Sequence, residues 1–205
     1  MTWWNGVSPC MELGVDGCVV WWDAWAAVGT TLGVLIALFS PAVRKYFMKK
    51  RVSAVFAASF SQRIFVARQA VKNFQELYPL SKQEDGIYTA RVLLQNDEAA
   101  RERAIGLIEN VEELTKMDVD LSKFPEVDTL LAADVARSIL FSGDVMLLIP
   151  AIRGRDNGVT EETWARYWES AALVMKRAED TLDHASAGCD KALRRMSIKR
   201  WGLLR

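Results

Sequence analysis

The most prominent pattern in the chain is an uninterrupted apolar run close to its start. Residues 24–43 (AWAAVGTTLGVLIALFSPAV) contain no charged side chain. A helix of this length extends about 30 Å, which matches the hydrocarbon core of a bilayer. Aromatic side chains, which favour the headgroup layer, flank the run on both sides: Trp21, Trp22, Trp25, Tyr46 and Phe47. The run therefore predicts a transmembrane helix.

Two other interpretations fit the flanks of this run less well. A buried helix of a globular core rarely needs so many uncharged residues followed at once by a basic segment. A cleaved signal peptide carries Lys or Arg before its apolar region, whereas residues 1–23 contain acids and no base. The sequence thus favours a retained membrane helix.

Downstream of the run, apolar residues recur at the spacing of amphipathic helices. The first such helix ends before Pro79, and its inward residues are Val52, Phe56, Phe60, Ile64, Ala67, Val71, Phe74 and Tyr78. Further helices are predicted over 87–95, from Asn96 or Asp97 to Lys116, from Pro125 to Ile149, and from Thr160 onward.

Two of these helices carry specific expectations. In the helix that ends at Lys116, the inward residues are Ala100, Ala104, Leu107, Val111 and Leu114. In the next helix, Pro125 suits the first turn, and Pro150 with the following RGRDNG loop is expected to end it.

The last predicted helix has a long and regular apolar seam. Its inward residues follow steps of four and three: Trp164, Trp168, Ala171, Met175, Ala178, Leu182, Ala185, Cys189, Ala192 and Met196. A seam of this period packs at a shallow angle against antiparallel helices or against another copy of itself. Packing within one chain is the favoured interpretation.

Taken together, the patterns predict an all-α protein. It consists of one N-terminal transmembrane helix followed by a cytoplasmic up-down helical bundle of four to five helices. The expected divisions are an extracytoplasmic tail, the membrane helix, a basic juxtamembrane segment, the bundle and a basic tail: 1–23, 24–43, 44–51, 52–196 and 197–205.

The charge distribution sets the expected orientation. The chain is neutral overall, yet residues 44–72 carry eight bases and no acid, and residues 73–190 carry a net charge of −11. Basic residues next to a membrane helix stay in the cytoplasm, so the N-terminus is expected outside. The residues expected to meet lipid headgroups are Arg44, Lys45, Lys49, Lys50, Arg51, Lys199, Arg200 and Trp201.

The three cysteines divide between the two sides of the membrane. Cys10 and Cys18 fall on the outer, oxidising side, where they either form a small disulfide loop or stay free. Cys189 falls on the reducing side and needs no partner.

Small residues in the membrane helix favour self-association. Gly29 and Gly33 form a GxxxG motif that Ala26 and Ala37 extend along nearly the same face. Small residues allow helix backbones to approach closely within lipid. The sequence therefore predicts a homo-oligomer with these four residues at the interface.

Sequence motifs for chemistry are scarce. With one His and no HExxH, a metal site is not expected, and no P-loop, Rossmann or GxSxG motif points to a cofactor or to hydrolysis. The acidic balance of residues 73–190 argues against a nucleic-acid surface. The expected partners are the lipid bilayer, further copies of the chain, and in one alternative a soluble protein.

One constellation is an exception. Arg177, Asp180 and His184 lie along one stripe of the last predicted helix, in the sequence RAEDTLDH. An Arg followed by a His at this spacing resembles the active motif of HEPN-fold ribonucleases, which are helical bundles. The resemblance implies that His184 moves the proton and that Arg177 stabilises phosphate charge. Because both residues follow seam positions by two, we expect them to point sideways or outward, as a solvated His beside a surface Arg–Asp pair would.

The layout as a whole is similar to the small membrane-anchored accessory proteins of type VI-B CRISPR systems. That resemblance implies a protein of the bacterial inner membrane that assembles and acts in antiphage defence. Three hypotheses follow: a non-enzymatic, self-associating membrane effector or scaffold, which is favoured; a membrane-tethered, metal-independent ribonuclease; and a passive scaffold for a soluble partner.

Overall fold

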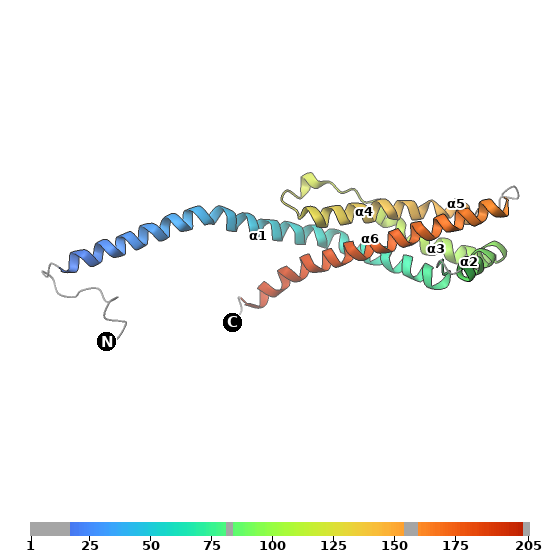
Figure 1. Cartoon of the computed structure of the whole chain (residues 1–205), viewed down its shortest axis with the longest axis horizontal. Helices are drawn as coiled ribbons and strands as arrows, with labels where there is room; N and C mark the ends of the chain where they lie inside the picture. Colours follow the sequence, from blue (N-terminus) through green and yellow to red (C-terminus); the bar gives the residue numbers. More distant parts are fainter. Residues whose placement is uncertain (1–16, 81–83, 154–159, 203–205) are drawn as a thin grey trace. The chain divides into compact units, whose positions relative to one another are not determined.

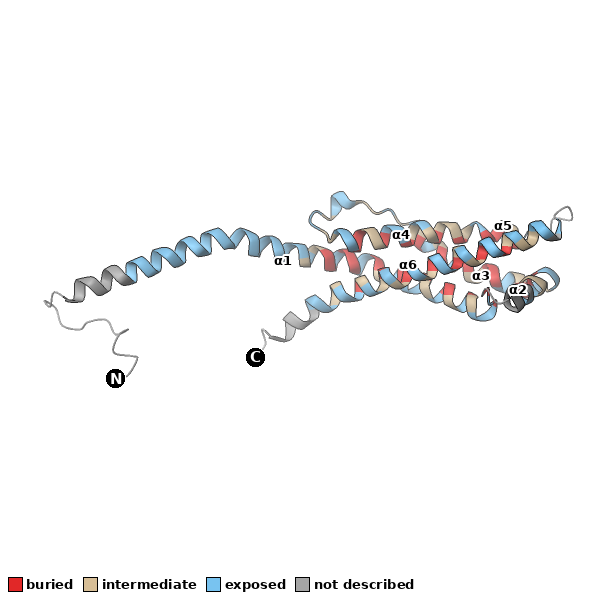
Figure 2. Cartoon of the chain, viewed as in Figure 1, coloured by how far each residue is buried: buried red, intermediate tan, exposed pale blue. Residues whose placement is uncertain are grey.

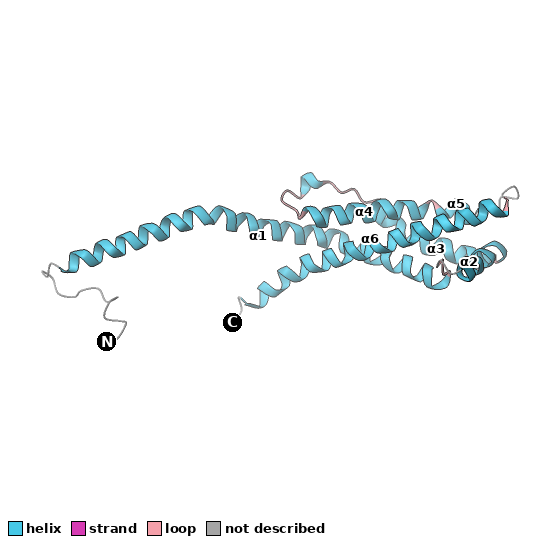
Figure 3. Cartoon of the chain, viewed as in Figure 1, coloured by secondary structure: helices cyan, strands magenta, loops and turns pink. Residues whose placement is uncertain are grey.

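The computed structural model describes residues 17–80, 84–153 and 160–202, and within them it is helical with short connections and no strand (Figure 3). The predicted all-α class is confirmed. The helices are α1 Gly17–Leu77, α2 Glu84–Asn96, α3 Glu98–Thr115, the 3-10 turn η2 Leu121–Lys123, α4 Thr129–Met146, α5 Leu148–Arg153 and α6 Glu161–Gly202 (Figure 1). The short segment at 87–95, expected as a helix, is one and begins earlier, at Glu84.

The chain divides into two units, Met1–Phe47 and Met48–Arg205. Helix α1 runs through the division without a break and contains Pro41. Burial changes along it: residues 25–49 are exposed on every side, whereas buried positions recur from Ser53 onward (Figure 2).

Helix ends that the sequence predicted from side-chain caps agree with the structure. Asp97 caps α3, and its carboxylate accepts hydrogen bonds from the amides of Ala99 and Ala100 at 2.9 and 3.2 Å. At the start of α6, the Thr160 hydroxyl accepts a longer contact of 3.4 Å from the amide of Thr163. Local capping chemistry fixes these ends because the orphan amides of a first turn need an acceptor.

The expected start of α4 at Pro125 is wrong. Glu126 has a φ of 72°, a left-handed conformation that a right-handed helix excludes. Asp128 is the N-cap instead, and its carboxylate accepts from the amide of Leu130 at 3.1 Å. The helix therefore begins at Thr129.

The expected end at Pro150 is also wrong. Helix α4 ends at Met146, and Pro150 lies inside the short helix α5. A proline has no N–H for the carbonyl four residues earlier and clashes with it, and here that carbonyl belongs to Met146. The break consequently falls one turn before the proline.

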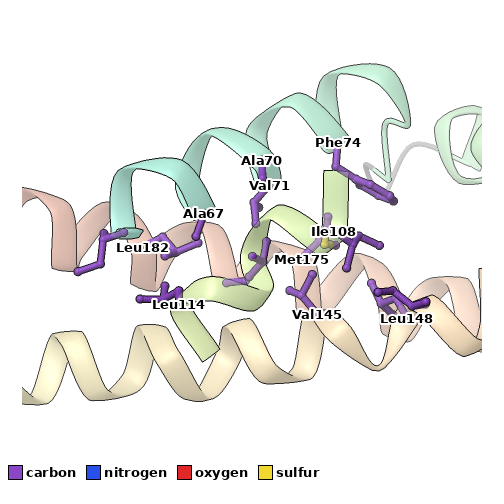
Figure 4. Packing of buried hydrophobic residues seen from close by; sticks show 14 of the residues in the cluster. Ala67, Ala70, Val71, Phe74, Ile108, Leu114, Val145, Leu148, Met175 and Leu182 are labelled. Atoms are coloured by element: carbon purple, nitrogen blue, oxygen red, sulfur yellow. The ribbon is translucent and has the colours of Figure 1, made fainter. Parts of the chain in front are cut away.

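The Met48–Arg205 unit is built around a core to which α1, α3, α4 and α6 all contribute (Figure 4). All expected inward residues of the 52–78 helix are buried except Val52, which is half-buried. In α3, the expected inward residue Leu107 is half-buried, and Ile105 and Ile108 are buried instead. The α3 seam is therefore broader than steps of three and four suggest.

The long seam of α6 is buried from Trp168 to Cys189. Trp164 and Ala192 are half-buried, and Met196 is 45% exposed, so the seam leaves the core at its last expected member. Helix α6 packs against α4, and Gly188 meets Leu131 near the start of α4. It also lies beside α1, where Asp183 contacts Arg68.

Candidate functional site

The apolar segment of α1 is exposed over its whole circumference. Its large apolar residues between Trp25 and Val43 are 44–68% exposed, and no charged residue interrupts the stretch. The Thr31 hydroxyl donates to the carbonyl of Ala27 at 2.7 Å, and Thr30 donates likewise within the helix. Both threonine hydroxyls are thus satisfied locally, as an apolar surrounding requires.

Two described helical stretches, Trp25–Leu77 in α1 and Thr129–Arg153 across α4 and α5, are long and apolar enough to cross a membrane by length and composition. In the first stretch, none of the most apolar 18 residues is buried, whereas in the second a third of them are buried. The second contains α4, which carries Asp134, Arg137 and Asp144 and contributes to the core. Burial and charge therefore separate the two, and α1 is the better membrane candidate.

The small residues of α1 leave open space beside them. A Cβ added at Gly29 or Gly33 would meet no atom within 4 Å. Ala26 and Ala37 are exposed on the same helix. None of the described residues therefore requires glycine at these two positions for reasons of space.

The basic residues beside the apolar segment are part of α1. Arg44, Lys45 and Arg51 are exposed and Lys50 is half-buried. Lys49 lies 3.8 Å from the carboxylate of Asp128. At the other basic stretch, Lys199, Arg200 and Trp201 fall within the bounds of α6, and the expectation for their side chains lies outside the described residues. So does the expectation for Cys10, while Cys18 is described only as part of α1.

The structure places Arg177, Asp180 and His184 on the exposed side of α6. His184 and Thr181 line a shallow hollow with Asp134 and Arg137 of α4. Arg177 is not among the residues that line this hollow. The arginine beside His184 is therefore Arg137, which sequence spacing could not reveal because the two residues are 47 positions apart and belong to different helices.

Asp183, next to His184, faces the other way and joins α6 to α1. Its carboxylate accepts hydrogen bonds from Arg68 and Lys72. Burial raises the pKa of Asp183, but the hydrogen bonds from the two bases outweigh this and bring the pKa below its ordinary value. The ion pairs of Asp183 thus determine which side of α6 faces α1. His184 lies on a different, exposed side of the helix.

A second hollow lies at the far end of the unit from Met48. It has a volume of about 30 Å³ and is lined by Arg91, Leu94, Gln95, Arg101, Ala151, Ile152, Trp164 and Trp168. The indole nitrogen of Trp168 is buried and has no hydrogen-bond partner among the described residues. The hollow has room for a water or two, which would supply that acceptor.

These features offer little chemistry. Among the described residues, no group of three or more His, Cys, Asp or Glu could hold a metal ion. His184 and Arg177 are both exposed, and of the two only His184 lines the shallow hollow between α4 and α6. Comparison with protein-family models, with curated proteins and with solved structures finds no match for this chain.

Proposed function

We propose that the chain is a non-enzymatic, single-pass inner-membrane protein whose cytoplasmic helical domain self-associates and acts as a membrane effector or scaffold. One observation carries the proposal: the uncharged segment of α1 is exposed all round, although its side chains are apolar. An apolar helix with no buried face needs lipid to cover it. Antiphage defence is the setting that the resemblance to type VI-B accessory proteins implies.

The remaining architecture supports this proposal. Helix α6 runs antiparallel to α4, because Gly188 meets Leu131 while Thr181 lies beside Arg137. Helix α1 also runs antiparallel to α6, because Ala67 of α1 lies towards Leu182 of α6 and Phe74 lies towards Met175 (Figure 4). An up-down bundle is the arrangement that these contacts favour. It would return the basic stretch at 194–205 to the end of the unit at which Met48 lies, where anionic lipid could attract it.

Self-association is tested in the membrane helix. Replacing both Gly29 and Gly33 with Ile should weaken association of the full-length chain in detergent, measured as mass by light scattering. The chain itself tolerates the larger side chains, since open space lies beside both glycines, so a lost interface is the expected cause.

A matched control places two isoleucines elsewhere on the same helix. Ala27 and Thr31 have the same four-residue spacing on another side of α1, and their replacement should leave the mass unchanged. An equal loss of mass in both variants, or no loss in either, would contradict a specific role for the glycine face.

Orientation is tested with the cysteines. We expect Cys10 or Cys18 to react from outside the cell with an impermeant maleimide, after reduction if they are paired. Cys189 should stay unreactive even in permeabilised cells at pH 8, because its side chain is only 1% exposed. In addition, burial and, to a smaller extent, the negative charge of Asp190 raise the pKa of its thiol to about 11. Labelling of Cys10 and Cys18 only after permeabilisation would reverse the orientation.

The ribonuclease alternative is tested at His184. Replacing His184 with Ala should leave association and any cellular phenotype unchanged, because the imidazole is solvated and a proton-transfer role needs a positioned substrate. Arg177→Ala is the companion variant. If the purified chain cleaves RNA and both substitutions abolish cleavage, the enzyme hypothesis replaces the present one.

A further inference from the structure

Helix α4 presents an unusual outward face. Its buried residues lie on one side: Leu131, Ala132, Val135, Ser138, Ser142 and Val145. On the opposite side, steps of three and four give a stripe of Leu130, Ala133, Arg137, Leu140 and Asp144, which Leu147, the C-cap residue of α4, extends. The three leucines of this stripe are 75%, 65% and 70% exposed. A solvent-facing side of a helix is normally polar.

Helix α1 has a comparable face within the Met48–Arg205 unit. Its exposed stripe consists of Val55, Ala58, Gln62, Phe65 and Gln69, and it carries no charge. Val55 and Phe65 are 55% and 54% exposed. By contrast, the exposed residues of α3 are typical of a helix that meets water: Glu98, Ala99, Glu102, Arg103, Glu109, Asn110 and Glu113.

The two stripes lie at matching heights along the unit. The Ser53 hydroxyl of α1 accepts a hydrogen bond of 2.9 Å from the amide of Asp128 at the start of α4. Both helices run antiparallel to α6, so they run parallel to each other. Because each rises 1.5 Å per residue, Val55 stands level with Leu130, and Phe65 stands level with Leu140, ten residues further along both helices.

The stripes point in different directions. Figure 4 shows the core side chains of α1, such as Val71, on one side of the cluster and Val145 of α4 on the other. Since each exposed stripe lies opposite the buried side of its helix, the α1 stripe and the α4 stripe face away from each other. One chain therefore cannot cover either stripe with the other.

We propose that copies of this chain associate head to tail, with the α1 stripe of one copy packed on the α4 stripe of the next. This inference rests on the proposed function, which anchors all copies in one membrane and keeps their α1 and α4 parallel. At equal height, Leu130 then meets Val55 of the next copy and Leu140 meets Phe65. The same register sets the charged Arg137 and Asp144 near two uncharged polar side chains of the α1 stripe, Gln62 and Gln69. Such a contact is heterologous and builds rings or arrays.

The charges on α4 favour this arrangement over a twofold one. If two parallel α4 helices packed on each other about a twofold axis, Arg137 would face Arg137 and Asp144 would face Asp144, and like charges at a contact are destabilising. A twofold contact through α1 alone would leave the three leucines of α4 uncovered. Covering α4 with lipid instead would bury both charges in hydrocarbon.

The test is disulfide cross-linking of the full-length chain in membranes, with the native cysteines replaced by Ser or Ala. The double variant Val55→Cys with Leu130→Cys should give a ladder of dimers, trimers and larger species on oxidation. The single variants should not cross-link alone, and a mixture of the two should give dimers only. The control pair Val55→Cys with Leu147→Cys uses an equally exposed leucine on the same stripe about 25 Å further along, and it should give no ladder.

A second measurement uses charge instead of cross-links. Leu140→Lys should reduce association in detergent at least tenfold, whereas Leu173→Lys, at a 51% exposed leucine of α6 outside both stripes, should not. Unchanged thermal melting of both variants shows that they fold. Efficient dimers from Val55→Cys or Leu130→Cys alone would overturn the head-to-tail contact. An oligomer that gives no ladder would also overturn the head-to-tail contact, but it would leave the proposed self-association intact. A membrane-inserted monomer would overturn both the contact and the self-association.

Discussion

Truncating Trp168 to alanine is expected to lower the free energy of unfolding of the Met48–Arg205 unit by about 3–5 kcal/mol, the range for a large aromatic residue in a core. The Trp168 side chain is 2% exposed and stacks on Trp164 with ring centroids 6.2 Å apart. Its ring also meets Tyr167 edge to face at 5.7 Å. Removal of the indole would leave a cavity beside the existing hollow, and the long helices around it cannot collapse to fill it.

Chemical denaturation of the full-length chain in detergent, followed by far-ultraviolet circular dichroism, measures this change. Leu173→Ala is the matched control, because Leu173 lies on the same helix and is 51% exposed; it should cost less than about 0.5 kcal/mol. Trp168→Phe separates volume from polarity: it keeps most of the apolar area and removes an indole N–H that lacks a partner among the described residues. Equal stability of the alanine variant and the parent chain would show that α6 does not need this end of its seam.

The long seam of α6 was predictable from sequence because its spacing is internal to one helix. Each of the seven seam residues from Trp168 to Cys189 repeats the period of its neighbours, so an error at one position does not shift the others. The cap of α3 was predictable as Asn96 or Asp97 for the same reason, since the carboxylate of Asp97 and the amides that it accepts from lie within three residues.

The predicted ends of α4 were wrong because a residue that favours a helix end was overridden by the conformation or capping of residues near it. Pro125 suits a first turn, but the left-handed conformation of Glu126 and the cap at Asp128 set the start of α4 later. Pro150 was expected to end a helix and does break one, but at Met146, where the lost hydrogen bond falls. Sequence marks the presence of such breaks more reliably than their position.

The features that depend on two helices were out of reach. No spacing rule places Arg137 beside His184, because their proximity depends on how α4 packs on α6. Whether Leu130, Leu140 and Leu147 stay uncovered depends on the helices packed beside α4, and in the structure they are 75%, 65% and 70% exposed. A pattern tells that a helix is apolar on two sides, and only the packed neighbours tell which side remains uncovered.

Replacing Val34 with Arg is expected to remove much of the chain from the membrane fraction. Val34 lies in the middle of the uncharged segment 24–43, where an arginine costs about 2.5–3.5 kcal/mol of insertion free energy. A cost of that size corresponds to a change of roughly two orders of magnitude in the insertion equilibrium. Val55→Arg is the matched control: the same substitution is made in the same helix at a valine that is 55% exposed, against 57% for Val34. Carbonate extraction of membranes should therefore release the Val34 variant and retain the Val55 variant. If both stay in the membrane pellet in equal amounts, the apolar segment does not span the bilayer, and an exposed apolar helix would need another protein to cover it.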